Sequence, residues 1–213
     1  MPTLKTYKIK TKEKNLFLRV VQGHFATGRS HTNYYIDVTL QKSRLSEASA
    51  VAKELVSFYN KSTIVDTILC LDETQVVGTC LAAELTKEDF MNMNAHQTIY
   101  VVTPEQTSGN QLIFRDSLSP MIKGKHVLIL AASVNTGYTA KAAIEAVNYY
   151  GGMVSGIASI FATADDCMGY PVHSVFNPKD LQDYQMHPSH ECPLCKKGEK
   201  IDALVNSFGF SKL

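Results

Sequence analysis

The segment His126-Val-Leu-Ile-Leu-Ala-Ala-Ser-Val-Asn-Thr-Gly-Tyr-Thr139 decides the fold. The run from Val127 to Ala132 carries no polar side chain, which is typical of a strand in the middle of a parallel sheet. A short polar turn follows. Residues 139–150 then have a helical pattern that stops at Gly151-Gly152, and glycine is favoured just beyond a helix end. The segment therefore predicts a buried strand, a turn and a helix in succession.

Strand and helix patterns alternate on both sides of this segment. Apolar residues recur every three to four positions between residues 43 and 59, which predicts a helix with one buried face. Further apolar runs predict strands at 16–21, 64–71, 98–102, 154–161 and 172–176, and a helix at 76–85. Such alternation is typical of an α/β fold, in which a parallel sheet is flanked by helices. The polar stretch 103–119 is expected to form a long surface loop or hairpin.

Composition narrows the class of protein. With 213 residues, of which 45% are hydrophobic and 19% charged, the chain can bury a core. The 21 basic and 20 acidic residues nearly balance, which favours a small-molecule or protein partner over nucleic acid or a membrane. The segment from Met1 to Lys14 is polar, no apolar stretch is long enough for a membrane span, and the five cysteines form no disulfide framework. We therefore expect a cytoplasmic protein.

The turn after the central strand has the chemistry of a phosphate site. A helix N-terminus at the carboxyl end of a parallel strand offers unpaired backbone N–H groups and a positive dipole end. Polar side chains add donors, and Gly137 lets the backbone approach a ligand closely. An alternative interpretation is that Thr136 or Thr139 only caps the helix. The turn matches neither a dinucleotide fingerprint nor a nucleoside-triphosphate loop.

Three stretches together resemble one family. The strand, turn and helix at 126–150 are similar to the ribose-5-phosphate loop of type I phosphoribosyltransferases. Gly23-His-Phe-Ala-Thr-Gly-Arg-Ser-His-Thr-Asn-Tyr-Tyr-Ile-Asp37 resembles the N-terminal orotate-side motif of the orotate branch, and Glu191-Cys-Pro-Leu-Cys-Lys-Lys-Gly198 resembles a C-terminal segment found in many of its members. The resemblance covers about residues 16–200.

This resemblance implies an architecture and a set of ligand contacts. It implies one domain over residues 1–213, with about 1–40 and 177–213 forming a small N-terminal or hood subdomain and a C-terminal extension. Tyr34 and Tyr35 would lie on the base side, although a strand tyrosine is also commonly packed against its neighbours. A homodimer is implied as well. The residues implied to bind the ligand phosphate are Ser133, Asn135, Thr136, Gly137, Tyr138 and Thr139.

The chain differs from the family pattern at positions where the family has charged residues. Ala131 and Ala132 stand where the family has two acidic residues for the ribose hydroxyls of the phosphoribosyl donor. The stretch matching the mobile hood loop, 102–109, contains no Lys, Arg or His. An Arg expected near residues 161–163 and a Lys expected just before Gly28 are also missing. Departing pyrophosphate needs preorganised cations, so these losses predict weak or absent transferase activity and no assigned catalytic residue.

Three functional hypotheses follow. The first is an orotate phosphoribosyltransferase-like protein that binds a ribose 5-phosphate or a nucleoside monophosphate and has weak or no transferase activity. No cofactor is assigned to it. The second is an active orotate phosphoribosyltransferase, requiring Mg²⁺, that takes charged groups from Arg115, Lys123 or a partner subunit. The third, a nucleic-acid regulator on this fold, is disfavoured by the neutral charge and the lack of a basic patch.

The Cys192-Pro-Leu-Cys195 pair has the spacing of a zinc knuckle, and His187 and His190 lie just upstream. Four ligands so close together in the sequence are hard to arrange as a tetrahedron, and the sequence shows no second pair. A reduced loop, a redox pair and structural zinc all remain open. The expectation from the sequence is that no zinc is bound in stoichiometric amount.

Overall fold

The chain divides into two compact units. The computed structural model describes residues 6–10, 16–89, 91–95, 97–109, 111–206 and 209–213. One unit, here the central unit, comprises Leu40–Asn177. The other, here the terminal unit, comprises Met1–Thr39 and Pro178–Leu213. The boundaries at 39 and 178 lie next to those at which the sequence interpretation separates the hood subdomain.

The central unit contains the sheet expected from the sequence. In the described ranges its strand order is β10-β11-β9-β8-β4-β5. The β8–β9, β4–β8, β4–β5 and β9–β11 pairs are parallel, and the short β10 is antiparallel to β11. The strands are β4 (Thr67–Cys70), β5 (Tyr100–Val102), β8 (His126–Val134), β9 (Met153–Ala162), β10 (Asp166–Cys167) and β11 (Tyr170–Phe176).

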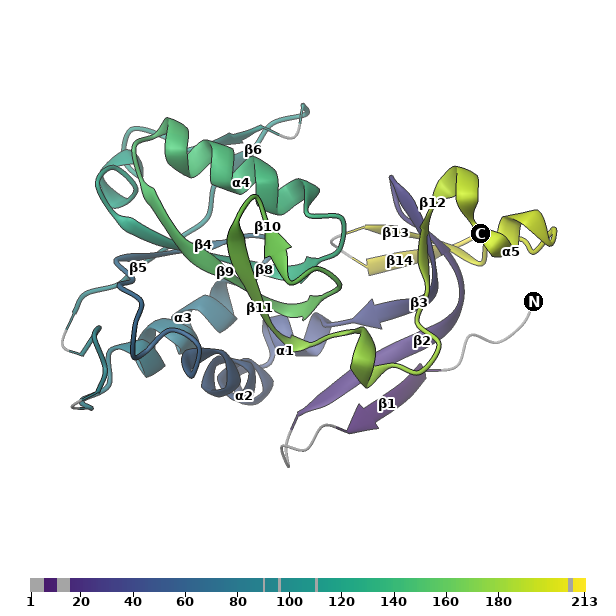
Figure 1. The fold of residues 1–213 in the computed structure, drawn as a ribbon, viewed down its shortest axis with the longest axis horizontal. Helices are drawn as coiled ribbons and strands as arrows, with labels where there is room; N and C mark the ends of the chain where they lie inside the picture. Colours follow the sequence, from purple (N-terminus) through teal and green to yellow (C-terminus); the bar gives the residue numbers. More distant parts are fainter. Residues whose placement is uncertain (1–5, 11–15, 90, 96, 110, 207–208) are drawn as a thin grey trace. The chain divides into compact units, whose positions relative to one another are not determined.

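Helices cover both faces of this sheet. Figure 1 shows α4 (Tyr138–Tyr149) on one face and α2 (Leu45–Val56) and α3 (Gln75–Leu85) on the other. A short helix, α1 (Thr39–Ser43), precedes α2, and a 3₁₀ turn at Ser119–Met121 precedes β8. The apolar side of α4 packs on β8 and β9 through Ala140, Ala143 and Ile144, all almost completely buried. Because β8 is covered on both faces, its residues from Val127 to Ala132 are all buried.

The polar stretch between β5 and β8 forms a hairpin. Its strands are β6 (Glu105–Gln106) and β7 (Leu112–Ile113), which pair antiparallel. Here the prediction of a loop or hairpin is confirmed.

The terminal unit is built on a second sheet, which is mainly antiparallel. Its order in the described residues is β12-β3-β2-β13-β14, with β1 also paired to β2. A small hydrophobic cluster contains Val21, Phe25 and Ala203, with Tyr35, Val205 and Phe210 packed against it. The elements are β1 (Thr6–Lys10), β2 (Phe17–Ala26), β3 (Ser30–Asp37), β12 (Met186–Pro188), β13 (Ala203–Asn206), β14 (Gly209–Lys212), the 3₁₀ turns at Pro178–Asp180 and Ser189–Glu191, and α5 (Pro193–Lys196).

The predicted fold class is confirmed: the central unit is an α/β layer structure with its helices on both faces. The sequence did not predict the second sheet, because this sheet pairs strands from the N-terminal segment with strands from the C-terminal segment. Over the described residues, no helix is long and apolar enough to span a membrane.

Candidate phosphate-binding site

The predicted strand, turn and helix are present at residues 126–149. β8 ends at Val134, α4 begins at Tyr138, and Asn135, Thr136 and Gly137 connect them. Gly137 occupies the N-cap position with φ +73° and ψ 0°, a left-handed conformation that glycine adopts without steric cost. Because a glycine cap has no side chain, no side-chain cap bonds to the first N–H groups of α4. This end of the helix is therefore suited to bind an anion.

Most of the hydroxyl-bearing residues of the turn are exposed. Thr136, Tyr138 and Thr139 are exposed, and Ser133 is half-buried. The alternative in which Thr136 or Thr139 is the helix cap is wrong, because the cap is Gly137. The structure thus brings an exposed set of hydroxyls to the same helix end as the backbone N–H groups of the first turn.

Residues that follow the adjacent strand β9 hold the loop through hydrogen bonds. The Thr163 hydroxyl donates to the carbonyl oxygen of Asn135 at 3.0 Å, and the Thr163 N–H donates to that of Val134 at 3.0 Å. The Cys167 thiol lies 3.7 Å from the carbonyl oxygen of Gly137. The Oδ1 atom of Asn135 is buried and has no hydrogen-bond partner among the described residues, so a donor role for Asn135 falls to its Nδ2. These contacts fix the backbone of the loop before any ligand arrives.

The two positions before the loop carry methyl groups in place of carboxylates. Ala131 and Ala132 are buried, with 1% and 7% of their surface exposed. Mg²⁺ prefers oxygen ligands, so these two side chains do not fit a divalent ion. One carboxylate does lie beside them, since Asp72 accepts a hydrogen bond from the N–H of Ala132. Burial raises the pKa of Asp72, although the Ala132 N–H and the charge of Lys42 oppose the shift.

Asp72 belongs to a turn that follows β4 at the same carboxyl edge of the sheet. Asp72 and Glu73 both have positive φ, at 51° and 63°, which is uncommon for residues other than glycine. The buried Lys42 ammonium donates to the carbonyl oxygen of Asp72 at 2.9 Å and lies 3.4 Å from Glu73 Oε2. The buried ammonium group of Lys42 therefore binds the turn that contains Asp72 and Glu73.

Two cations, Arg115 and Lys123, were considered from the sequence as substitutes for the missing charges. The first is held in an ion pair, and the second lies far from the loop. Arg115 makes a two-point ion pair with Glu105 of the hairpin, with both N–O distances at 2.7 Å. Lys123 precedes the amino end of β8, whereas the loop follows its carboxyl end, about 26 Å away along the strand. Lys123 therefore cannot contact a phosphate in the loop.

The base-side residues Tyr34 and Tyr35 lie on β3 in the terminal unit. Tyr35 stacks edge-on against Phe210, with ring centroids 5.0 Å apart, and contacts Phe25 at 6.0 Å. Burial raises the pKa of Tyr35, with a further contribution from Asp37. Tyr34 is half-buried and, as the next residue on the strand, points to the opposite face. A contact of either ring with a base stays a prediction.

The cysteine pair has partners that the sequence did not reveal. Cys192 and Cys195 lie beside His24 and His31, which come from the N-terminal segment. The two upstream histidines considered from the sequence are not part of this group of four: His190 is paired with Glu191, and His187 has a buried Nε2 atom without a partner among the described residues. The missed signal is the pair of histidines on the β2–β3 hairpin, which lie near the opposite end of the sequence from the cysteines.

Comparisons with known sequences agree on one family name. No protein-family model matches the chain. The orotate phosphoribosyltransferase of Caldanaerobacter subterraneus is 37% identical over 78 residues, which is 36% of this chain and 39% of that protein. The orotate phosphoribosyltransferase of Chlorobaculum parvum is 26% identical over 186 residues, covering 86% of this chain and 88% of that protein.

Solved structures agree on the fold. The UMP synthase of Leishmania donovani superimposes with a TM-score of 0.56 at 20% identity, covering 76% of this chain but only 34% of that one. The orotate phosphoribosyltransferase of Mycobacterium tuberculosis in complex with 5-phospho-α-D-ribosyl 1-diphosphate gives a TM-score of 0.50 at 17% identity, covering 69% of this chain and 82% of that one.

Strand order, loop position and these likenesses together define the class: this is a protein of the type I phosphoribosyltransferase fold. Within that fold class, the chain is similar in sequence to curated orotate phosphoribosyltransferases.

Proposed function

We propose that this protein binds a ribose 5-phosphate or a nucleoside monophosphate through the loop at residues 133–139, and that it makes orotidine monophosphate weakly or not at all. One observation carries the proposal. The loop joins a left-handed Gly137 cap, the N–H groups of a helix start and exposed hydroxyls, while the adjacent Ala131 and Ala132 supply no carboxylate.

The proposed binding is supported by the groups that would donate hydrogen bonds to the phosphate. The groups aimed at a phosphate are chiefly backbone N–H groups at the start of α4, and Thr163 holds the loop in place from the end of β9. The Mycobacterium tuberculosis enzyme, which shares this fold, was solved with the phosphoribosyl donor bound. A monophosphate is the simplest ligand that such a loop fits.

Weak catalysis is supported by the missing charges. The ribose hydroxyls of a donor would meet methyl groups at 131 and 132, and the stretch 102–109 carries no cation for the departing pyrophosphate. If each missing contact costs about 2 kcal/mol in the transition state, three of them lower the rate by about four orders of magnitude.

Isothermal titration tests the binding half of the proposal. Ribose 5-phosphate, orotidine monophosphate and the phosphoribosyl donor are titrated in parallel into the wild-type chain and into Thr139→Val. We expect the monophosphates to bind and Thr139→Val to weaken them. Thr79→Val is the matched control, because Thr79 is an exposed residue of α3 whose hydroxyl donates within its own helix, to the Gln75 carbonyl. Absence of binding by all three ligands would refute the proposal.

A spectrophotometric orotate assay tests the catalytic half. With donor, Mg²⁺ and purified protein, we expect turnover more than a hundredfold below a typical enzyme rate of about 10 per second. Turnover above that limit would favour the active-enzyme hypothesis and would show that other residues supply the missing charge.

A further inference from the structure

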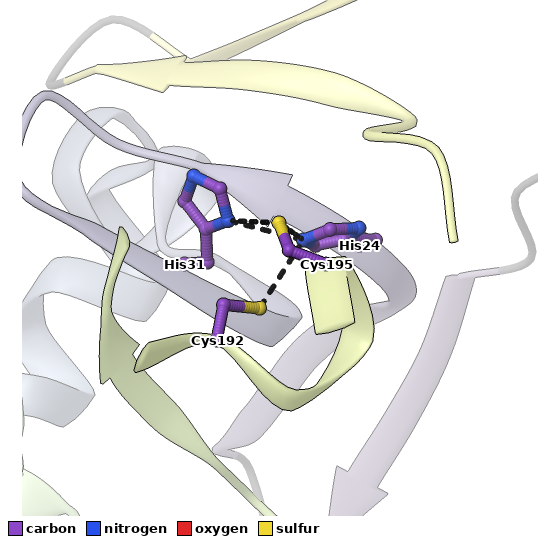
Figure 2. Close-up of side chains that lie close together, drawn as sticks. All are labelled: His24, His31, Cys192 and Cys195. Carbon is purple, nitrogen blue, oxygen red and sulfur yellow. Dashed lines mark hydrogen bonds between the residues drawn. The ribbon is translucent and has the colours of Figure 1, made fainter. Parts of the chain in front are cut away.

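Four metal-binding side chains converge within the terminal unit. They are His24, His31, Cys192 and Cys195, and their ligand atoms all lie within 4.8 Å of one another. Figure 2 shows the two imidazole rings and the two thiols pointing toward a common centre. His24 lies on β2 and His31 on β3, so the two rings project from neighbouring strands of one hairpin. Cys192 immediately precedes α5 and Cys195 lies within it.

Four of the six distances between the ligand atoms match the edges of a zinc tetrahedron. Zn–N bonds of about 2.0–2.1 Å and Zn–S bonds of about 2.3 Å place tetrahedral ligand atoms about 3.3 Å apart for N–N and about 3.6 Å apart for N–S. The Nε2 atom of His24 lies 3.1 Å from the Nδ1 atom of His31. Three N–S distances are 3.5 Å for His24–Cys192, 3.7 Å for His24–Cys195 and 3.2 Å for His31–Cys195. Each lies within about 0.4 Å of the expected edge.

Hydrogen bonding within the cluster does not account for this convergence. The Nδ1 atom of His24 faces the carbonyl oxygens of Glu199 and Lys200, at 3.1 and 3.2 Å. Because carbonyl oxygens only accept, Nδ1 carries the proton, and Nε2 is left with a single lone pair. That lone pair faces three groups at once: His31 and both thiols. A cation at the centre would satisfy all four ligand atoms together.

The carbonyl contacts of His24 are themselves typical of a metal site. A histidine that binds zinc usually donates its other ring N–H to a carbonyl or carboxylate, which fixes the tautomer and the ring orientation. The backbone of His24 is held as well, since its N–H donates to the Asp202 carboxylate at 2.8 Å. The ligand atom of His24 is therefore preorganised.

We propose that His24, His31, Cys192 and Cys195 bind one Zn²⁺ ion in a closed tetrahedral site with a structural role. Two thiolates and two imidazoles in this geometry favour zinc over Mg²⁺ or Ca²⁺, which prefer oxygen ligands. Four protein ligands leave no open position for a substrate, so the site is structural. His24, His31 and Cys192 are buried while Cys195 is exposed, which gives the ion a route of entry. This proposal reverses the expectation from the sequence that no zinc is bound.

Zinc would add a cross-link between the N-terminal and C-terminal segments of the terminal unit. One hydrophobic cluster of this unit has only three buried residues, and β13 pairs with β2 through only two registered residue pairs in the described ranges, Ala203–Phe25 and Leu204–Ala26. Units with small cores commonly depend on a metal or a disulfide for stability. A zinc ion shared by the β2–β3 hairpin and α5 would fasten the C-terminal segment to the N-terminal one.

Elemental analysis of the full-length chain, purified without chelator or affinity metal, tests the proposal. We expect about one zinc per chain, and loss of that zinc in Cys195→Ser and in His31→Ala. The matched controls are His190→Ala, an exposed histidine outside the cluster, and Cys80→Ser, a free cysteine of the central unit; both should keep the metal. Absence of zinc in the wild-type chain even after incubation with Zn²⁺, or its full retention in both ligand variants, would overturn the proposal.

A second measurement covers variants that fail to fold. X-ray absorption of the zinc-loaded wild-type chain reports the ligand set directly, and we expect two nitrogen ligands at about 2.0 Å and two sulfur ligands at about 2.3 Å. An oxygen-rich shell, or a disulfide between Cys192 and Cys195 in the freshly purified chain, would equally refute the assignment. We also expect a chelator to lower the thermal midpoint of the wild-type chain, because zinc binding is coupled to folding.

Discussion

Substituting Gly137 with alanine tests the geometry on which the proposed phosphate binding depends. In the left-handed region, where Gly137 lies at φ +73°, an L-residue costs about 1–2 kcal/mol. The added Cβ would also meet the Cys167 sulfur at 3.3 Å, closer than an ordinary van der Waals contact. We expect Gly137→Ala to lower the free energy of unfolding by about 1–2 kcal/mol from the backbone alone, with up to about 1 kcal/mol more from crowding.

Gly124→Ala is a matched control for the backbone term. Gly124 has φ +69°, nearly the same as Gly137, and its added Cβ would have no atom within 4 Å. It precedes the amino end of β8, at the opposite end of the strand from the loop. Urea unfolding should therefore give the backbone cost in Gly124→Ala and the backbone cost plus crowding in Gly137→Ala.

Titration with ribose 5-phosphate separates binding from stability. Alanine at 137 favours a right-handed conformation, which would rotate the N–H groups at the start of α4 away from the ligand. We expect Gly137→Ala to weaken binding at least tenfold, or about 1.4 kcal/mol, and Gly124→Ala to leave binding unchanged. Equal affinity in Gly137→Ala and the wild-type chain would refute the reasoning, because the loop would then not need its left-handed residue.

Two further predictions concern pH and assembly. Burial raises the pKa of Asp66, but its hydrogen bonds from His126 and the charges of His126 and Lys125 outweigh burial and leave the pKa below its ordinary value. A carboxyl group whose pKa is lower in the folded state stabilises the fold at pH values above its unfolded-state pKa, and this stabilisation is lost as the pH falls through the folded-state pKa. Asp66→Asn should therefore lower the free energy of unfolding by up to about 1 kcal/mol at neutral pH, and the difference from the wild-type chain should shrink as the pH falls below about 4. A difference that does not depend on pH in urea titrations would contradict this. We also expect a homodimer, from the family resemblance, and a sedimentation mass equal to that of a single chain at micromolar concentration would contradict it.

The central unit was predictable because its signals are local. The run of apolar residues at 127–132 is typical of a covered strand, and the structure has β8 there, followed by Gly137 at the N-cap of α4. Predicted boundaries differ from the observed ones mainly at strand ends: β4 begins at Thr67, where the apolar run begins at residue 64, and β8 continues to Val134, past the predicted end at 132. Such errors occur because the pattern of apolar residues does not determine where the hydrogen bonds between neighbouring strands end.

The terminal unit was not predictable in the same way, because its sheet joins segments from the two ends of the chain. β2, near the start of the sequence, pairs with β13, near its end, and no local pattern encodes that pairing. The four-residue cluster has the same origin, since the histidines and the cysteines come together only when this sheet forms. Spacing singled out the cysteine pair, but the two histidines that lie near it in the sequence, His187 and His190, are not part of the cluster.

In the proposed function, binding and catalysis would rest on different kinds of atoms, so that one could persist without the other. The donors for a phosphate are backbone N–H groups at a helix start, and these depend on the αL conformation of Gly137 rather than on any charged side chain. Stabilising a departing pyrophosphate depends on side-chain cations, and Arg115 is instead held by Glu105. On this proposal, substitutions that remove side-chain charge would abolish pyrophosphate stabilisation first and leave the backbone phosphate site intact.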